Sequence, residues 1–303
     1  MNLVIVESPA KAKTINKYLG SDYKVLASYG HVRDLPSKNG SVDTDHDFKM
    51  VWEIDPGSKK HLKEITDYAI DADRIILATD PDREGEAIAW HLKCILEDNK
   101  KIKDKKFERV VFNEITKKAV ENGISNPRDI NPELVNAYMA RRALDYLVGF
   151  NISPILWTKL PGSKSAGRVQ SVALRLIVDR EHDIELFKPQ EYWTFACTFL
   201  TQQKKELNAR LYSFKGNKIE KFSFKNEQEI NNVLDQIKKE SFSIASIDKK
   251  PYRRSPYAPF TTSTMQQEAS KKLGFSASRT MQIAQRLYQG IDLEGDTVGL
   301  ITY

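Results

Sequence analysis

The sequence contains little cysteine and no long apolar run, and both absences limit what the protein can be. Only Cys94 and Cys197 occur among the 303 residues, which provides neither a disulfide framework nor a metal-binding cysteine pair. No apolar stretch approaches the roughly 18 residues that span a bilayer, and the first residues lead directly into a predicted strand rather than a signal peptide. We therefore expect a soluble protein of a reducing cytoplasm, with no membrane partner.

A strong excess of charge of one sign is also missing. The chain has 47 lysines and arginines against 41 acidic residues, a net charge of +6. Binding to a polyanion must therefore be argued from local clusters of basic residues rather than from the total. The 40% of hydrophobic residues is enough to bury a sizeable core, divided over two to four domains.

The most informative stretch follows the apolar run Ile75 to Ala78, which ends at Asp80, Asp82 and Glu84. Like charges about 4 Å apart repel by roughly 4 kcal/mol at an effective dielectric near 20, so protons, Arg83 or a divalent cation must compensate them. Oxygen ligands on a strand-to-helix turn suit Mg²⁺. The alternative is a solvated turn in which Asp82 caps the next helix, but one carboxylate would serve for that.

Strand-like and helix-like segments alternate in the first part of the chain, which predicts an α/β fold with a parallel sheet. Glu7 and the turn that carries Asp80, Asp82 and Glu84, called the acidic turn below, then both lie at carboxyl ends of strands, where open sheets bind ligands. His31, after the second strand, either joins them or is structural. The predicted strands are residues 3–6, 23–29, 75–78 and 107–112, and the predicted helices are 9–19, 59–70 and 85–95.

Several basic residues occupy unusual positions on predicted helices. Lys11 and Lys13 lie in the early turns of a helix, where the macrodipole disfavours cations, so they form a phosphate cradle or are simply exposed. In the predicted helix 131–149, Arg141 lies on the apolar stripe and Arg142 about 100° away. Arg141 must therefore bind an anion, such as a DNA phosphate, or extend its head group to solvent.

The rest of the chain changes character twice. Small residues at 162–167 precede a helix and expose backbone N–H groups, a weak sign of anion binding. Residues 191–250 are strand-like at 192–200, 207–214 and 242–247, with a helix at 227–239. Predicted helices at 263–273 and 276–290 resemble a helix-turn-helix, and a predicted strand, Val298 to Thr302, leads to Tyr303.

Six segments, in order along the chain, resemble motifs of the bacterial type IA DNA topoisomerases, and of topoisomerase I more than topoisomerase III. They are Glu7-Ser-Pro-Ala-Lys11, Gly30-His-Val-Arg-Asp-Leu-Pro, Thr79-Asp-Pro-Asp-Arg-Glu-Gly-Glu, Val111-Phe-Asn-Glu-Ile-Thr, Ser165-Ala-Gly-Arg-Val-Gln-Ser and Pro259-Phe-Thr-Thr-Ser-Thr. The resemblance implies an α/β Toprim domain at 1–120, part of a helical DNA-binding domain at 121–190, part of a β-rich arch at 191–252, and an incomplete helix-turn-helix-like domain at 253–303.

The resemblance also implies a chemistry. Tyr303, in Gly299-Leu-Ile-Thr-Tyr303, attacks a phosphodiester of single-stranded DNA and forms a 5′-phosphotyrosine, so that a strand of a negatively supercoiled duplex can pass before religation without ATP. The implied catalytic residues are Tyr303, Glu7, Lys11 and Arg83, and the implied Mg²⁺ ligands are Asp80, Asp82, Glu84 and Glu7. The implied DNA-binding residues are His31, Arg33, Arg109, Arg141, Arg142, Ser165, Arg168, Gln170, Gln285 and Arg286.

The implied enzyme is a monomer that acts on DNA at the nucleoid of the bacterial cytoplasm. The family motif continues past the nucleophile with Met-Arg-Thr-Asp-Ser, whereas this sequence stops at Tyr303, so we expect that the chain as it stands does not relax supercoiled DNA. Gln289 also replaces a glutamate common in the family. Two alternatives remain open: a Toprim nuclease or primase, which needs no tyrosine, and a non-catalytic module that binds single-stranded DNA.

Overall fold

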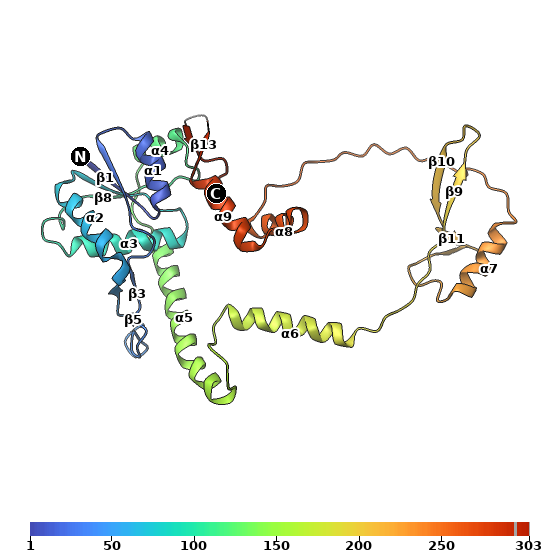
Figure 1. The fold of residues 1–303 in the computed structure, drawn as a ribbon, viewed down its shortest axis with the longest axis horizontal. Coiled ribbons are helices and arrows are strands. Elements are labelled where there is room, and N and C mark those ends of the chain that lie inside the picture. Colours follow the sequence, from blue (N-terminus) through green and yellow to red (C-terminus); the bar gives the residue numbers. More distant parts are fainter. Residues whose placement is uncertain (294–295, 303) are drawn as a thin grey trace. The chain divides into compact units, whose positions relative to one another are not determined.

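The computed structural model describes residues 1–293 and 296–302. It divides into two compact units, the first formed by Met1–Val172 with Ala258–Tyr303 and the second by Ala173–Tyr257. The first unit carries the main sheet and the second carries small antiparallel ribbons (Figure 1). Among the described residues, no helix is long and apolar enough to cross a membrane.

A four-stranded sheet in the order β2-β1-β7-β8 lies at the centre of the first unit. All of its strand pairs are parallel, which confirms the predicted sheet. Its strands are β1 (Asn2–Val6), β2 (Tyr23–Ala27), β7 (Arg74–Leu77) and β8 (Phe107–Arg109). The helices around it are α1 (Pro9–Tyr18), α2 (Lys59–Asp71), α3 (Arg83–Glu97) and α4 (Lys117–Ser125), with the short η1 (Pro56–Ser58) before α2.

The two faces of this sheet bury alternate residues of each strand, because successive side chains of a strand point to opposite sides. Leu3 and Leu77 belong to a cluster completed by α2 and α3. Val4 and Ile76 belong to the opposite cluster, completed by α1 and α4. The sheet is therefore covered on both faces, and its carboxyl edge is the part left available for chemistry.

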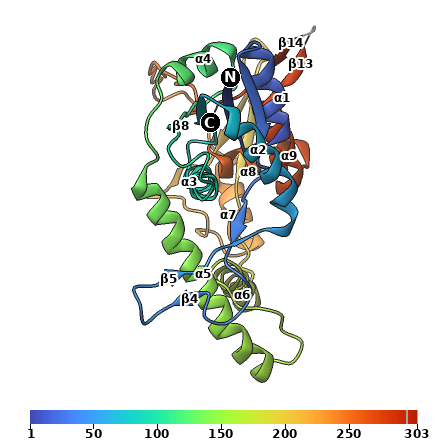
Figure 2. The ribbon, with the colours of Figure 1, turned by 90° about the vertical axis from the view of Figure 1, so that its left-hand side faces the viewer.

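Short ribbons and a long helix adjoin the sheet. The ribbons are β3 (Arg33–Asp34) with β6 (Glu53–Ile54), and β4 (Val42–Asp43) with β5 (Lys49–Met50). α5 (Pro132–Lys159) is capped by Asn131 and leads away from the sheet (Figures 1 and 2). It continues ten residues beyond the predicted end near Gly149, and Pro154 lies within it.

The C-terminal part of the first unit contains α8 (Thr262–Leu273), α9 (Ala277–Gln289), β13 (Ile291–Leu293) and β14 (Asp296–Val298). The two predicted helices are confirmed, and α9 lies beside α1 (Figure 2). The Thr14 hydroxyl donates to the carbonyl of Gln289 at 2.9 Å. The predicted strand Val298 to Thr302 is wrong, because β14 ends at Val298 and residues 299–302 turn back toward Ile115.

The second unit holds little buried surface. Its cluster is centred on Phe224, Ile230 and Val233. Its elements are most of α6 (Gln170–Leu186), β9 (Ala196–Leu200), β10 (Glu206–Arg210), β11 (Ser213–Phe214), β12 (Asn217–Lys218) and α7 (Glu227–Ile237). The predicted strand 242–247 is wrong, because that segment pairs with no neighbouring strand, and Ile244 and Ile247 are exposed.

Ile76 offers a direct test of the core. It is fully buried in a central strand. We expect Ile76→Ala to lower the free energy of unfolding by about 2–5 kcal/mol, because it removes apolar contacts and leaves a cavity, and Ile76→Val to lower it by about 0.5–1.5 kcal/mol. Denaturant titration measures both, and an alanine variant within 1 kcal/mol of wild type would contradict this placement.

Candidate active site

A buried lysine joins two carboxylates from neighbouring strands. Lys11 Nζ lies 2.9 Å from Glu7 Oε1 and 2.9 Å from Asp80 Oδ1, and its side chain is 0% exposed. Glu7 follows β1, and Lys11 comes one helical turn later because Ser8 caps α1 directly after the strand. Asp80 follows β7, the strand beside β1. The position of Lys11 against the helix macrodipole is thus offset by two anions, whereas Lys13 is exposed.

Glu7 is the carboxyl group of this site that is best suited to hold a proton. Burial raises its pKa, the Lys11 charge lowers it, and the Asp80 charge raises it, so that the pKa lies above its ordinary value. Its Oε2 is buried and has no hydrogen-bond partner among the described residues. A proton on this carboxyl would leave Lys11 paired with Asp80 alone.

A buried ion pair between Arg109 and Glu86 fixes the backbone of the acidic turn. Arg109 and Glu86 are both 0% exposed, and Arg109 Nε donates to Glu86 Oε2 at 3.0 Å. The same guanidinium donates to the carbonyls of Thr79 at 2.8 Å and Asp80 at 2.6 Å. Arg128 adds two hydrogen bonds of 2.8 Å to Glu86. Arg109 was predicted to contact the DNA backbone or to support the active site, and in this structure it is buried and holds the backbone of the acidic turn.

Gly85 allows the turn to close. A Cβ atom at this position would lie 2.2 Å from the carbonyl oxygen of Asp80, so no other residue fits there without movement of the backbone. The Thr79 hydroxyl donates to the Gly85 carbonyl at 2.6 Å. The Asp82 side chain accepts from the Gly85 amide and caps α3, as the alternative interpretation of this residue required.

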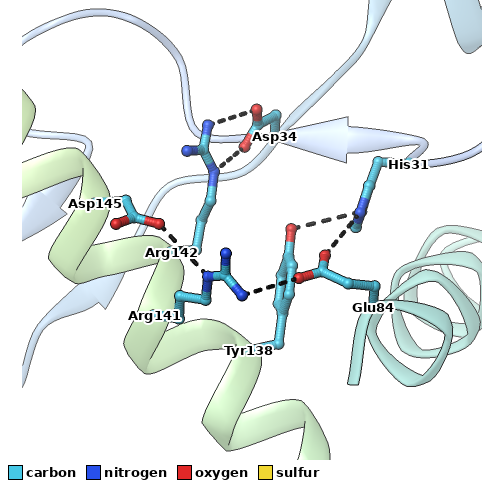
Figure 3. A pocket seen from close by; sticks show the side chains of 7 residues that line it. All are labelled: His31, Asp34, Glu84, Tyr138, Arg141, Arg142 and Asp145. Atoms are coloured by element: carbon cyan, nitrogen blue, oxygen red, sulfur yellow. Dashed lines mark hydrogen bonds and ion pairs between the residues drawn. The ribbon is translucent and has the colours of Figure 1, made fainter. Parts of the chain in front are cut away.

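A cavity of about 340 Å³ opens beside the acidic turn (Figure 3). His31 Nε2 lies 3.2 Å from Glu84 Oε2, and Arg141 reaches the same carboxylate at 3.9 Å. Arg142 makes two hydrogen bonds of 2.6 Å to Asp34. The cavity is lined by His31, Asp34, Glu84, Tyr138, Arg141, Arg142 and Asp145. Two arginines and a histidine around one opening provide donors for a phosphate, once their carboxylate partners release them.

Aromatic rings surround the side chain of Arg33, next to the cavity. Arg33 Nε donates to His91 Nδ1, and its guanidinium lies 4.9 Å from the Trp90 ring and 5.8 Å from the Trp52 ring. These partners orient Arg33, which was predicted to bind DNA and is half-buried. His91 is fully buried, and burial lowers its pKa to about 3, with smaller contributions from the charges of Arg33 and His31.

The structure separates the other predicted site residues. Arg168 binds Asp145 at 2.7 Å and so lies at the rim of the cavity. Arg83 is half-exposed and lies 3.9 Å from Glu84. Four further predicted residues are exposed, and none of them is among the residues that line this cavity: Ser165, Gln170, Gln285 and Arg286. Tyr303, the predicted nucleophile, lies outside the described residues.

Sequence reasoning missed the contacts that α9 makes with this site. The Tyr288 hydroxyl donates to Asp80 Oδ1 at 3.1 Å, the same oxygen that Lys11 approaches. The Gln289 side chain donates to Ser8 Oγ at 3.2 Å. Tyr288 lies on the apolar stripe of α9 with Ala284, so its pattern predicts a core residue, and it is indeed buried.

The four predicted metal ligands do not form one cluster. Glu7 and Asp80 share Lys11, Asp82 caps α3, and Glu84 pairs with His31. Within residues 1–293 and 296–302, no three acidic, histidine or cysteine side chains form a group that could hold a metal ion. A site for Mg²⁺ here would have to rest on one or two carboxylates.

Comparisons with known proteins agree along the whole chain. Residues 2–115 match the Toprim domain and residues 129–303 match the family described as DNA topoisomerase. Proteins named DNA topoisomerase 1 from Rickettsia bellii and Zymomonas mobilis are 55% and 54% identical, and the matched region covers 100% of this chain but 38% and 24% of theirs. The structure of full-length topoisomerase I from Thermotoga maritima has 38% identity and a TM-score of 0.78, over 99% of this chain and 48% of that one.

Substitution of Arg109 tests whether its buried ion pair with Glu86 stabilises the fold around the acidic turn. We expect Arg109→Met to lower the free energy of unfolding by about 3–5 kcal/mol, because Glu86 then keeps its burial with a single remaining cationic partner. The matched control is Lys38→Met, which removes an exposed pair with Glu53 and should cost less than about 1 kcal/mol. Equal effects of the two variants in denaturant titration would contradict the role given to Arg109.

His91 makes the fold sensitive to acid. Its folded pKa is about 3 and its ordinary value is 6.5, so the unfolded chain binds more protons between these values. Stability is therefore full above pH 6.5 and falls as the pH drops, by up to about 1.4 kcal/mol per pH unit. In His91→Asn, which keeps an acceptor for Arg33 but cannot titrate, we expect a weaker fall between pH 6.5 and 4. Parallel stability curves for the two proteins would disprove this.

Proposed function

Because this chain belongs to the DNA topoisomerase family, we propose that its site takes part in breaking and rejoining the DNA backbone through a tyrosyl phosphodiester. The observation that carries the proposal is the buried Lys11 between Glu7 and Asp80, beside a cavity lined by arginines. The chain spans 38% of the length of the Rickettsia bellii relative. We therefore propose relaxation of negatively supercoiled DNA for an enzyme of the full length of the relatives, not for this chain alone.

In the proposed cleavage step, the Tyr303 hydroxyl releases its proton to water and its oxygen bonds to phosphorus, as the bond from phosphorus to the 3′ oxygen breaks. Glu7 donates its proton to the departing 3′ oxygen, and the raised pKa supports this role because it keeps the carboxyl protonated to a higher pH. Lys11, relieved of one anion when Glu7 is protonated, stabilises the charge of the phosphate. Rejoining reverses each transfer.

The cavity beside the acidic turn is the proposed site for neighbouring phosphates. Three arginines at this cavity each form an ion pair with a carboxylate: Arg141 with Glu84, Arg142 with Asp34 and Arg168 with Asp145. A DNA phosphate would displace those carboxylates and accept the same paired N–H donors. The proposed substrate is a single-stranded segment, because a single tyrosyl phosphodiester breaks one strand at a time.

Mg²⁺ is the proposed cofactor. Asp80, Asp82 and Glu84 supply oxygen atoms at one strand end, and Mg²⁺ needs only one or two carboxylates beside water and phosphate. The Oε2 of Glu7, which has no hydrogen-bond partner among the described residues, is a further acceptor in this region when Glu7 is deprotonated. When bound, the ion would neutralise acidic charge and hold DNA phosphates in position for rejoining.

The proposed organisation follows the same family. Residues 1–120 would form the metal-binding Toprim domain, 121–190 part of a DNA-binding helical domain, 191–252 part of a β-rich arch, and 253–303 the part that carries the nucleophile. We place the enzyme, as a monomer, in the bacterial cytoplasm at the nucleoid. No ATP is needed, since the phosphotyrosine conserves the bond energy.

A covalent adduct tests the proposed chemistry. Single-stranded DNA labelled at its 3′ end is incubated with the chain, alone and extended to the length of its relatives, and then denatured. We expect label bound to the extended wild-type protein and no bound label with Tyr303→Phe, because only the tyrosine can retain the 5′ phosphate. A free 5′-phosphate end produced by both proteins would favour a Toprim nuclease, and DNA binding without cleavage would favour a non-catalytic module.

A further inference from the structure

Tyr29 has an unusual backbone conformation close to the candidate site. It follows β2 with a φ of 61°, in the left-handed region that residues with side chains rarely adopt. Its neighbours fix it there: the Ser28 amide donates to the Val6 carbonyl at 2.8 Å, and the Gly30 amide donates to the Glu7 carbonyl at 2.9 Å. The strained residue is therefore held directly beside Glu7 rather than in a free loop.

The side chain of Tyr29 does not offset this strain by burial. Its ring stacks on His61 of α2, with 3.7 Å between centroids and 21° between planes. His61 covers one face of the ring, while 54% of the residue remains exposed. A large aromatic side chain held rigidly in this way contributes little to the core and presents a flat surface to solvent.

The first turn of α2, next to this stacked pair, is basic, whereas Glu64, about one turn after His61, is an exposed acid. Lys59, Lys60 and Lys63 of α2 are exposed, and the first turn of that helix contains no acidic residue. His31, two residues after Tyr29, lines the cavity proposed for phosphates. A basic surface with an aromatic platform is the combination that binds single-stranded nucleic acid without reading its sequence.

We propose that Tyr29, backed by His61, is a stacking platform for one unpaired base of the DNA strand that occupies the site. This rests on the proposed function, which supplies the strand. With the phosphate held near His31 and the arginines, an adjacent base stacks on the open face of the tyrosine. The platform keeps the strand from sliding, because its position is fixed to Glu7 through the backbone.

Two substitutions separate stacking from folding. Tyr29→Gly removes the ring at a position where glycine adopts the observed φ without strain, so we expect an unchanged or higher thermal midpoint. In fluorescence anisotropy with labelled single-stranded oligonucleotides, affinity should fall roughly 5- to 100-fold. Tyr29→Phe keeps the ring and should bind within about twofold of wild type. Equal affinity of Tyr29→Gly and wild type would overturn the proposal.

Salt dependence and abasic oligonucleotides complete the test. Tyr29→Gly should leave the slope of affinity against salt unchanged, because no charge is removed, whereas Arg142→Ala should reduce it by about 1. Scanning one abasic position through the oligonucleotide should weaken binding to wild type at one place and not weaken binding to Tyr29→Gly there. Equal abasic losses in both proteins would also overturn the platform. Absence of salt-dependent binding by wild type would instead overturn the proposed function.

Discussion

The ammonium group of Lys11 is the interaction on which the site depends. Glu7 and Asp80 follow adjacent parallel strands, so the topology of the sheet forces two carboxylates toward each other. A buried cation at 2.9 Å from both is what makes that arrangement stable. Protonation of Glu7 also changes the charge of the site, because it removes one of the two anions that compensate Lys11 and so leaves more positive charge to bind a phosphate.

Buried charge also fixes the turn that carries Asp80. The guanidinium of Arg109 binds the backbone carbonyls of Thr79 and Asp80, where the turn begins, and Glu86 compensates its charge in the interior. Such an ion pair contributes little net stability compared with apolar packing, but it defines one backbone path because the guanidinium bonds to the carbonyls of Leu77, Thr79 and Val110 at once. Gly85 completes the arrangement, since a side chain there would collide with Asp80. Rigidity at this turn is thus built from polar contacts, whereas the sheet beneath it is built from apolar ones.

Much of this could be predicted from the sequence, and the failures have physical reasons. Strand and helix alternation predicted the parallel sheet, because periodicity records which side chains are buried. The grouping of Glu7 with Asp80 followed from the carboxyl ends of parallel strands. The burial of Arg109 could not be predicted, because its partner Glu86 lies on another element and arginine is mostly a surface residue. The strand expected at 242–247 failed because an alternating pattern needs a partner strand, which that segment does not have among the described residues.

The contact between α9 and the acidic site combines hydrogen bonds with apolar packing, because Tyr288 also belongs to the core cluster on the α1 side of the sheet. Tyr288 reaches Asp80, and Gln289 reaches Ser8 and Thr14, through hydrogen bonds that water can replace. Each such bond contributes only about 0.5–1.5 kcal/mol net, so much of the strength of this contact comes from the burial of the Tyr288 ring. The proposed chemistry requires a DNA strand to enter between the segment that leads to Tyr303 and the carboxylates. The hydrogen bonds to Asp80 and Ser8 can be replaced by water, whereas any movement of α9 away from the site would also have to expose the Tyr288 ring.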